Sequence, residues 1–335
     1  MNITVIGAGA WGTALAVSLS AGHRVTLWAR DAAQIEAMRL TRCNQHYLAD
    51  IPLPANLELS TDFSAALAGA DLAIIAVPTG ALRPILQQVM QSPRCSPGRS
   101  GNFGVLSACK GFEAETSLLP HQVAAEVLPE RFQYGVLSGP SFAQEVARGL
   151  PTALTLASAD EEFAQHTAQA LHHARLRIYA SNDVVGVEVG GAVKNVMAIA
   201  AGICDGMGLG HNARAALLTR GLAEIARLGL KLGGRPETLS GLSGAGDLIL
   251  TCTGDLSRNR RVGMLLVQQH DLPEILRQLG HVAEGVYTVR EVHRLAQRTC
   301  VAMPICEAVY RVLYEQLSPP EAVEILLNRT PNTEF

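Results

Sequence analysis

Short apolar runs alternate with helical patterns over the first half of the chain. The runs are rich in β-branched residues and are bounded by turn-forming residues, which is typical of buried strands. They predict strands at residues 3–6, 25–28, 72–77, 105–107, 135–137, 152–156 and 175–179. Helical spacing predicts helices at residues 13–20 and 32–40. Strands that alternate with helices predict an α/β fold, with a Rossmann-like, doubly wound and mainly parallel sheet.

The pattern changes near residue 180. The polar residues at 181–183 are good N-cap residues, and the apolar spacing beyond them is helical. It predicts helices at residues 212–232, 286–296 and 305–314, the first of them capped by Asn212. We therefore predict two domains, an α/β domain at residues 1–180 and an all-helical domain at residues 181–335.

Composition and charge exclude several classes of protein. Apolar residues make up 48% of the 335 residues and charged residues 17%, a balance that disordered chains do not have. The formal charge of −3 indicates no surface for nucleic acid. The uncharged stretch at residues 1–22 is long enough to span a bilayer, but it has no basic segment and is broken by glycines. The next candidate stretch is interrupted by Glu188, Lys194 and Asp205, so we expect a soluble, cytoplasmic protein without integral membrane association.

Cysteine and histidine spacing gives no metal motif. The seven cysteines contain no CxxC pair, and the ten histidines show no HExxH pattern. A secreted disulfide scaffold would be shorter and richer in cysteine. We therefore expect reduced thiols and no bound metal.

A glycine-rich turn follows the first predicted strand. Gly7, Gly9 and Gly12 form a GxGxxG pattern that opens the next helix. The first glycine permits the tight turn, the second lets the backbone approach a pyrophosphate, and the third lets the helix pack on the strand. The phosphates of the ligand then lie at the positive end of the helix. This position in the pattern predicts a dinucleotide-binding site.

The end of the second predicted strand bears on the choice of dinucleotide. An acidic residue about 20 positions after the glycines binds the ribose hydroxyl of NAD. Here Arg30 stands at the strand end and is followed by Asp31. Because a guanidinium pairs well with a 2′-phosphate, we predict a preference for NADPH over NADH. A solvated Arg30 is the alternative, and Asp31 leaves NAD open.

Polar residues that suit catalysis follow later strands and interrupt an apolar helix. Lys110 comes just after one predicted strand, and Gly139 and Ser141 come after the next, at the sheet edge where ligands bind. Lys194 lies in an apolar helical stretch, where a charge is costly. Burial beside another cation would lower its pKa and make it a proton donor near neutral pH. The alternatives are a solvated Lys110, and a Lys194 that reaches the helix edge or pairs with Glu188.

Two polar segments in the second half suit a phosphorylated ligand. Asp247 follows a glycine-rich turn and enters an apolar run. Further on, residues 257–261 read Ser-Arg-Asn-Arg-Arg. Guanidinium groups bind phosphate oxygens bidentately, so this cluster favours a phosphate-bearing ligand. A solvated helix start is the alternative, above all for Arg260 and Arg261.

Six separated segments together resemble one known family. They read GAGAWGTALA, SACKGFE, LSGPSFAQEV, GGAVKNVMAIAAGICDGMGLGHNARAAL, LSGAGDLILTCTGDLSRNRRVG and VAEGVYTV. In this order, from about residue 3 to about residue 315, they resemble the bacterial NAD(P)-dependent glycerol-3-phosphate dehydrogenases. The resemblance implies reversible hydride transfer between NAD(P)H and dihydroxyacetone phosphate, which gives sn-glycerol 3-phosphate for phospholipid synthesis. It also implies a homodimer.

The resemblance further implies roles for matching residues. Lys194 resembles the proton donor to the ketone oxygen, and Lys110 resembles a second cation shared by substrate and nicotinamide. Asn195 would orient the substrate, and Arg258 would hold its phosphate. The residues implied to bind substrate are Lys110, Gly139, Ser141, Lys194, Asp247, Ser257, Arg258 and Asn259. Those that would bind the cofactor are Gly7, Gly9, Trp11, Gly12, Arg30, Lys110, Ala143, Arg258, Val282 and Glu284.

Two other functions stay open at this point. A 3-hydroxyacid dehydrogenase also joins a Rossmann domain to a helical one with a catalytic lysine. That family spaces its lysine and asparagine one helical turn apart, whereas Lys194 and Asn195 are adjacent. A catalytically silent NADP(H)-sensing module would need only the amino-terminal half of the chain. The presence of Lys194 and Arg258 in the other half argues against it. Cofactor binding without turnover would favour the sensing module.

Overall fold

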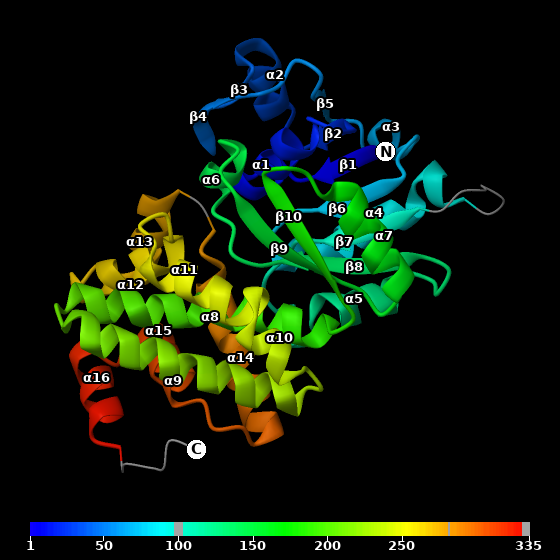
Figure 1. Ribbon diagram of the computed structural model, residues 1–335. Helices are drawn as coiled ribbons and strands as arrows, with labels where there is room; N and C mark the ends of the chain where they lie inside the picture. Colours follow the sequence, from blue (N-terminus) through cyan, green and yellow to red (C-terminus); the bar gives the residue numbers. More distant parts are fainter. Residues whose placement is uncertain (97–102, 281, 330–335) are drawn as a thin grey trace.

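The computed structural model describes residues 1–96, 103–280 and 282–329, and it places an α/β part beside a helical part (Figure 1). The strands of the main sheet are β1 Asn2–Ile6, β2 Arg24–Trp28, β5 Glu58–Ser60, β6 Leu72–Ile75, β7 Gly104–Ser107, β8 Gln133–Ser138, β9 Thr152–Ala157 and β10 Leu176–Ser181. A separate hairpin pairs β3 Cys43–Asn44 with β4 Leu48–Pro52.

Helices connect the strands and then form the second part of the chain. Those of the α/β part are α1 Ala10–Leu19, α2 Ala32–Thr41, α3 Phe63–Leu67, α4 Leu82–Gln91, α5 Pro120–Val127, α6 Ala143–Ala147 and α7 Glu161–Leu171. The helical part consists of α8 Val184–Gly206, α9 Gly210–Lys231, α10 Pro236–Ser240, α11 Asp247–Thr253, α12 Arg258–Val267, α13 Leu272–Leu279, α14 Glu284–Thr299, α15 Pro304–Tyr314 and α16 Pro319–Leu327. The predicted fold class is confirmed.

The main sheet is mostly parallel and has a switch in its winding at β1. Its strand order is β10-β9-β8-β7-β6-β1-β2-β5. All neighbouring pairs are parallel except β8 and β9, so β9 and β10 run opposite to the rest. Because β1 pairs with β2 on one side and β6 on the other, the chain winds away from β1 in both directions. Ligands of open α/β sheets bind at the carboxyl ends of the strands beside such a switch.

Some element boundaries differ from the sequence prediction. α1 begins at Ala10 rather than at residue 13, since the glycine turn leads directly into the helix. α9 begins at Gly210, so Asn212 is not its cap; the connection from α8 is only three residues long. Asp183 does cap α8, because its carboxylate accepts the Gly186 N–H at 2.9 Å.

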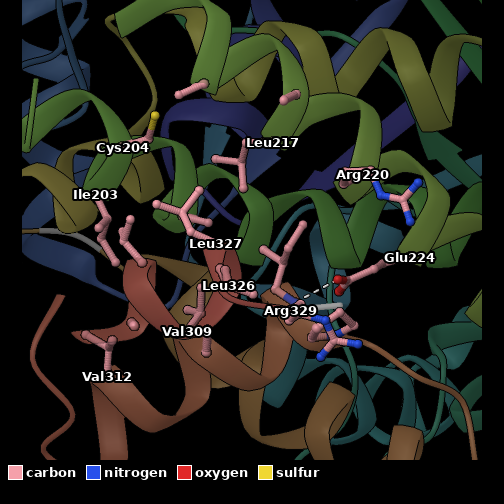
Figure 2. A pocket seen from close by; sticks show the side chains of 18 of the residues that line it. Ile203, Cys204, Leu217, Arg220, Glu224, Val309, Val312, Leu326, Leu327 and Arg329 are labelled. Carbon is pink, nitrogen blue, oxygen red and sulfur yellow. Dashed lines mark hydrogen bonds between the residues drawn. The ribbon is translucent and has the colours of Figure 1, made fainter. Parts of the chain in front are cut away.

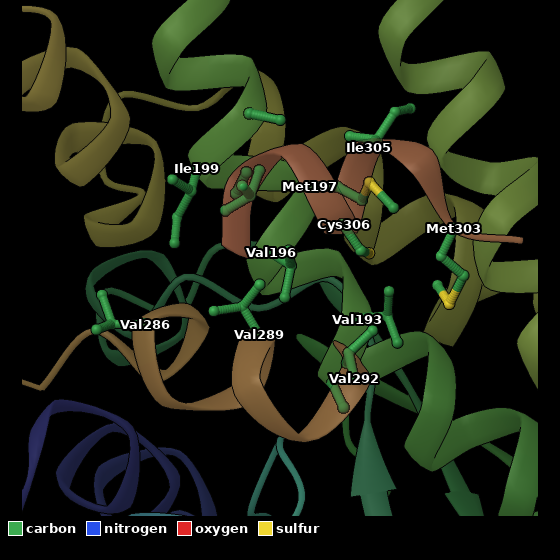
Figure 3. Close-up of a cluster of buried hydrophobic side chains, with 14 of the residues drawn as sticks. Val193, Val196, Met197, Ile199, Val286, Val289, Val292, Met303, Ile305 and Cys306 are labelled. Carbon is green, nitrogen blue, oxygen red and sulfur yellow. The ribbon is translucent and has the colours of Figure 1, made fainter. Parts of the chain in front are cut away.

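Helix α8 is the central element of the helical part. It contacts α9, α11, α12, α14 and α15. On one side, α8, α9, α15 and α16 enclose a groove with a volume of about 720 Å³, which we call the α9–α16 groove (Figure 2). On another side, Val193 and Val196 of α8 pack near Val289 and Val292 of α14 in a buried apolar cluster (Figure 3).

The apolar character of α8 comes from this central position. By length and composition the helix is able to cross a membrane, with a mean hydropathy of 1.5. However, 89% of its apolar stretch is buried inside the protein, so α8 is a core helix. The charges of Glu188 and Lys194 therefore do not explain why this stretch is no membrane span, as the sequence suggested, because both side chains are buried in α8 and are paired there.

Helices α8 and α12 cross with their backbones in direct contact. A side chain at Gly202 of α8 would lie 1.9 Å from the carbonyl oxygen of Arg260, and one at Gly263 of α12 would lie 2.0 Å from the carbonyl oxygen of Ile199. Only glycine allows this approach. The crossing sets the distance between the residues that α8 and α12 carry.

We expect Gly202→Ala to lower the free energy of unfolding by about 1–3 kcal/mol, because the added methyl group forces the two helices apart. The matched control is Gly206→Ala, one turn further along α8, where the nearest atoms are 3.1 Å away in the Val267 side chain. Denaturant unfolding of both variants measures the difference. Equal stability of the two variants would show that the crossing tolerates a side chain.

Candidate active site

The glycine turn after β1 has the geometry that its sequence predicts. Gly7 has a φ of +112°, and its N–H donates to the Trp28 carbonyl oxygen at 2.8 Å. A side chain at Gly12 would lie 1.9 Å from the Gly7 carbonyl oxygen, so α1 starts in contact with the turn. At Gly9 the equivalent space is empty, and no side chain caps α1. The amino end of α1 therefore has open space on the side where a phosphate would approach.

Arg30 and Asp31 have different surroundings at the end of β2. The Asp31 carboxylate caps α2, accepting the Ala33 N–H at 2.9 Å and the Gln34 N–H at 3.2 Å. Arg30 is exposed, and no hydrogen bond or ion pair to it is found within the described part of the chain. The guanidinium is thus free to meet a ligand, while the neighbouring carboxylate serves the helix.

Asp247 joins two lysines from distant parts of the chain. Its Oδ2 accepts from Nζ of Lys110, just beyond β7, at 2.7 Å, and its Oδ1 accepts from Nζ of Lys194 in α8. The side chains of Lys194 and Asp247 are 7% and 1% exposed, and that of Lys110 is 16% exposed. A single buried carboxylate therefore connects the edge of the sheet to the core helix.

Lys194 has the lowered pKa that its apolar helix predicts. Burial lowers the pKa to about 7; Asp247 opposes this shift, and the positive charge of Lys110 adds to it. Lys194 also donates to the Thr251 hydroxyl at 3.0 Å. It does not pair with Glu188, whose carboxylate binds His121 instead. Lys194 is therefore a buried amine that changes its charge near neutral pH.

Gly139 and Ser141 lie beside Lys110. Gly139 has a φ of +128°, and its carbonyl oxygen accepts from Nζ of Lys110 at 3.0 Å. The Ser141 hydroxyl donates to the same oxygen at 2.9 Å. This carbonyl and Asp247 together fix the position of the Lys110 ammonium group.

Two asparagines connect the site across three helices. Nδ2 of Asn195 donates to the Lys110 carbonyl oxygen at 3.4 Å, and its Oδ1 accepts from Nδ2 of Asn259 at 3.0 Å. Asn259 in turn accepts the Gly285 N–H at 3.0 Å. These contacts join the Lys110 loop to α8, α12 and α14.

At the start of α12, some side chains stabilise the fold and another is available to a ligand. The buried Ser257 hydroxyl caps α12 by accepting the Arg260 N–H at 3.2 Å. Arg260 pairs with Asp205 at 2.6 Å, so it is not a free phosphate ligand. Arg258, the first residue of the helix, is exposed, and no hydrogen bond to its side chain is found within the described residues.

Glu284, the first residue of α14, lies close enough to Arg258 for their charges to interact. The Glu284 carboxylate accepts the Thr79 N–H at 3.4 Å. Burial raises the pKa of Glu284 to about 7, against the opposing effects of that N–H and of the Arg258 charge. Val282 is exposed two residues before it.

Trp11 and Ala143 lie in helices that follow the carboxyl ends of β1 and β8. Both pack in one small apolar cluster with Ala14 and Val146. Nε1 of Trp11 is buried without a hydrogen-bond partner in the described chain, and indole N–H groups that are buried usually have one. An acceptor from a ligand would satisfy this donor.

The structure thus joins seven of the predicted residues by hydrogen bonds. Lys110, Gly139, Ser141, Lys194 and Asp247 form one hydrogen-bonded group that is joined to Asn195 and Asn259. Arg30 and Trp11 lie outside this group. The sequence analysis missed Thr251, although it stands four residues after Asp247, a spacing that puts both on one helix face. It also missed the Ser138 hydroxyl, which is buried and unpartnered and lies where a side chain at Gly191 would be.

The cysteines and the possible metal ligands lie apart from one another among the described residues. All seven cysteines are free, and only Cys300 is exposed. Within the described residues no three histidine, cysteine or acidic side chains gather as metal ligands would.

Comparisons with known proteins agree in both halves of the chain. Residues 2–164 match the profile of the NAD-dependent glycerol-3-phosphate dehydrogenase N-terminus, and residues 183–324 match that of the C-terminus. A glycerol-3-phosphate dehydrogenase [NAD(P)+] of Thiobacillus denitrificans is 59% identical, and one of Dechloromonas aromatica is 57% identical, each over 335 residues and the whole of both chains.

A solved structure matches just as fully. The crystal structure of glycerol-3-phosphate dehydrogenase from Coxiella burnetii is 42% identical and has a TM-score of 0.92, covering 98% of this chain and 99% of that one. D-Mandelate dehydrogenase shares only the fold, at 15% identity and a TM-score of 0.62. From these matches over its full length, the chain belongs to the NAD-dependent glycerol-3-phosphate dehydrogenase family.

Proposed function

We propose that the chain catalyses the reversible reduction of dihydroxyacetone phosphate by NAD(P)H to sn-glycerol 3-phosphate, the precursor of glycerophospholipids. The observation that carries the proposal is the pair of ammonium groups of Lys110 and Lys194 on Asp247, at the carboxyl edge of a dinucleotide-type sheet. The activity of the similar enzymes, given by their names, supports it.

The residues around the glycine turn fit a dinucleotide. The uncapped amino end of α1, the open space at Gly9 and the unpartnered Nε1 of Trp11 all suit a polar ligand there. When bound, the nicotinamide supplies the hydride. The residues that we assign to the cofactor are Gly7, Gly9, Trp11, Gly12, Arg30, Lys110, Ala143, Arg258, Val282 and Glu284.

The chain's own residues supply the proton and hold the substrate. As the hydride reaches the carbonyl carbon, protonated Lys194 gives its proton to the carbonyl oxygen, and Lys110 stabilises the negative charge that develops on that oxygen. In the reverse direction, neutral Lys194 takes the hydroxyl proton. Asp247 holds both amines in place, and Arg258 binds the phosphate. The other residues assigned to the substrate site are Gly139, Ser141, Asn195, Ser257 and Asn259.

The two directions of the reaction should depend on pH in opposite ways. Reduction needs protonated Lys194, whose pKa is about 7, so its kcat/KM should fall as the pH rises through this value. Oxidation needs the neutral amine, so its kcat/KM should rise over the same interval. Asp247→Asn removes the charge that opposes the shift and should move both inflections to lower pH. Inflections of the same sign in both directions would exclude Lys194 as the shared acid and base.

The activity itself is tested by following nicotinamide absorbance with purified protein and dihydroxyacetone phosphate. Unphosphorylated dihydroxyacetone is the control. Oxidation of the nicotinamide that requires the phosphate supports the proposed substrate. Cofactor binding without oxidation would contradict the proposal and favour the sensing module.

We infer a preference for NADPH from the free guanidinium of Arg30. Arg30→Ser should lower kcat/KM with NADPH by a factor of about 10 to 100, because a charge-assisted hydrogen bond to the 2′-phosphate is worth about 1.5–3 kcal/mol. The kcat/KM with NADH should hardly change. Arg24→Ser, at the opposite end of β2, is the matched control. Equal efficiency of the unaltered protein with both cofactors would refute the role of Arg30.

We further propose that residues 1–180 bind the cofactor and that residues 181–335 supply most of the substrate site. β10 ends at Ser181 and α8 begins at Val184, which supports a boundary between them. The homodimer remains a prediction from the resemblance, and the cytoplasmic location remains a prediction from the composition and cysteine usage of the sequence. Sedimentation analysis of the purified protein tests the first of them.

A further inference from the structure

The α9–α16 groove has one apolar end and one charged end. Figure 2 shows Ile203, Val309 and Val312 toward one side, and Arg220, Glu224 and Arg329 gathered toward the other. Its volume of about 720 Å³ lies within the range of about 300–1,000 Å³ that is usual for small-molecule sites. The groove is separate from the active site, since Ile203 is nine residues beyond Lys194 on α8, roughly 14 Å along the axis.

The charged end carries an excess of positive charge. Its lining includes Arg220, Arg227 and Arg329 against the single carboxylate of Glu224. Glu224 is 1% exposed and is already bound by the Ile305 N–H at 2.7 Å and the Cys306 N–H at 3.2 Å, at the amino end of α15.

These three arginines form no ion pair within the described residues. Arg227 donates only to a backbone carbonyl, that of Ala302, at 3.0 Å. Arg220 and Arg329 are exposed, and neither pairs with a carboxylate in the part of the chain that the structure describes. Two guanidinium groups that line an apolar groove, with no carboxylate partner among the described residues, match an anionic group attached to an apolar chain.

We propose that the α9–α16 groove binds a single acyl chain that carries a phosphate monoester. The aliphatic side chains of α8, α9, α15 and α16 hold the acyl chain, and Arg220 and Arg329 bind the phosphate. A phosphate monoester fits better than a carboxylate because it has more oxygens and more negative charge to share between two guanidinium groups. The helix that carries Lys194 forms one wall of the groove.

The same charges argue against a second copy of this chain as the occupant. A two-fold contact brings the same patch of both copies together, so Arg220 and Arg329 of each would meet like charges. Such contacts are unfavourable, and covering the arginines would leave them without counter-ions.

The test is a binding measurement without nicotinamide or ketone, so its result is independent of the proposed function. Calorimetric titration of the full chain with 1-oleoylglycerol 3-phosphate, kept below its micellar concentration, should give one saturable site per chain. The comparison ligands are 1-oleoylglycerol 3-phosphocholine, which has the same chain and a neutralised phosphate, and oleate. Both should bind at least about tenfold more weakly, which corresponds to about 1.4 kcal/mol.

Matched variants locate the site. Ala216→Trp places an indole in the groove and should weaken binding at least about tenfold, whereas Ala215→Trp on the adjacent exposed position should not. Arg220→Gln combined with Arg329→Gln should also weaken binding at least about tenfold. Arg298→Gln, an exposed arginine outside the groove, should leave it unchanged.

Three outcomes would overturn the proposal. The first is that the Ala216→Trp and Ala215→Trp variants bind 1-oleoylglycerol 3-phosphate equally well, or that the unaltered protein binds oleate or the phosphocholine lipid as tightly as it binds this ligand. The second is a dimer that Ala216→Trp disrupts and Ala215→Trp does not, with no lipid bound, which would assign the groove to a second copy. The third is binding that occurs only after residues 330–335 are removed, which would assign the groove to the end of this chain.

Discussion

Replacement of Lys194 by alanine is expected to abolish measurable turnover while leaving NADPH affinity nearly unchanged. A positioned general acid contributes a factor of about 10²–10⁴ to the rate, and no other described side chain that bonds to Asp247 combines a lowered pKa with this degree of burial. In the proposed site the cofactor binds at the glycine turn and its neighbours, which the substitution does not touch. Steady-state kinetics in both directions, together with NADPH titration, measure the two effects separately.

The control for this experiment is Lys231→Ala. The chain has only three lysines, and Lys231 is the exposed one, at the end of α9. Because Lys194→Ala leaves Asp247 with a single cation, thermal unfolding should be compared, and Lys194→Met serves as a variant of more similar volume. A Lys194→Ala protein that is folded and keeps most of its activity would disprove the assignment.

Replacement of Arg258 by leucine is expected to lower kcat/KM for dihydroxyacetone phosphate by a factor of roughly 10²–10³. Loss of one partner from a hydrogen-bonded charge pair costs about 2–5 kcal/mol, and the phosphate would lose its guanidinium. Slow reduction of unphosphorylated dihydroxyacetone should change much less, since this ligand has nothing for Arg258 to bind. The ratio of the two rates therefore isolates the phosphate contact.

Arg261→Leu is the matched control for Arg258→Leu. Arg261 is exposed on the same helix, three residues further on. Its loss should leave both rates near those of the unaltered protein. If Arg258→Leu slowed both ketones equally, Arg258 would be acting through the cofactor or through the fold rather than through the substrate phosphate.

Local sequence patterns predict where the strands of this fold lie better than they predict the direction in which each strand runs in the sheet. Seven of the eight strands of the main sheet were placed correctly, because burial and turn residues are properties of neighbouring positions; the three-residue edge strand β5 was missed. The reversed direction of β9 and β10 was not indicated, since an apolar run reads alike in either direction. The β3–β4 hairpin was missed because its first strand has only two residues.

The candidate site, like the fold, contains features that local sequence patterns predict and features that they do not. A glycine turn and a lysine inside an apolar helix are visible in the sequence, because each violates the pattern around it. The role of Asp247 as the common partner of Lys110 and Lys194 depends on contacts between residues 53 and 137 positions apart, which local patterns do not contain. Asp31 was considered only as a ligand-binding residue, and Ser257 as a ligand-binding residue or part of a helix start; both cap helices.

The shared carboxylate of Asp247 also has a consequence for the order in which the parts of the protein become complete during synthesis. A ribosome releases the sheet, with its glycine turn and Lys110, well before it has joined residue 247 to the growing chain. Domains generally fold as they emerge, the amino-terminal one first. Early in synthesis the nascent chain therefore has a fold suited to a dinucleotide but no means of fixing both amines. If Lys110 and Lys194 have the roles proposed for them, the site forms only when the second part docks on the first, and an incomplete chain should be inactive.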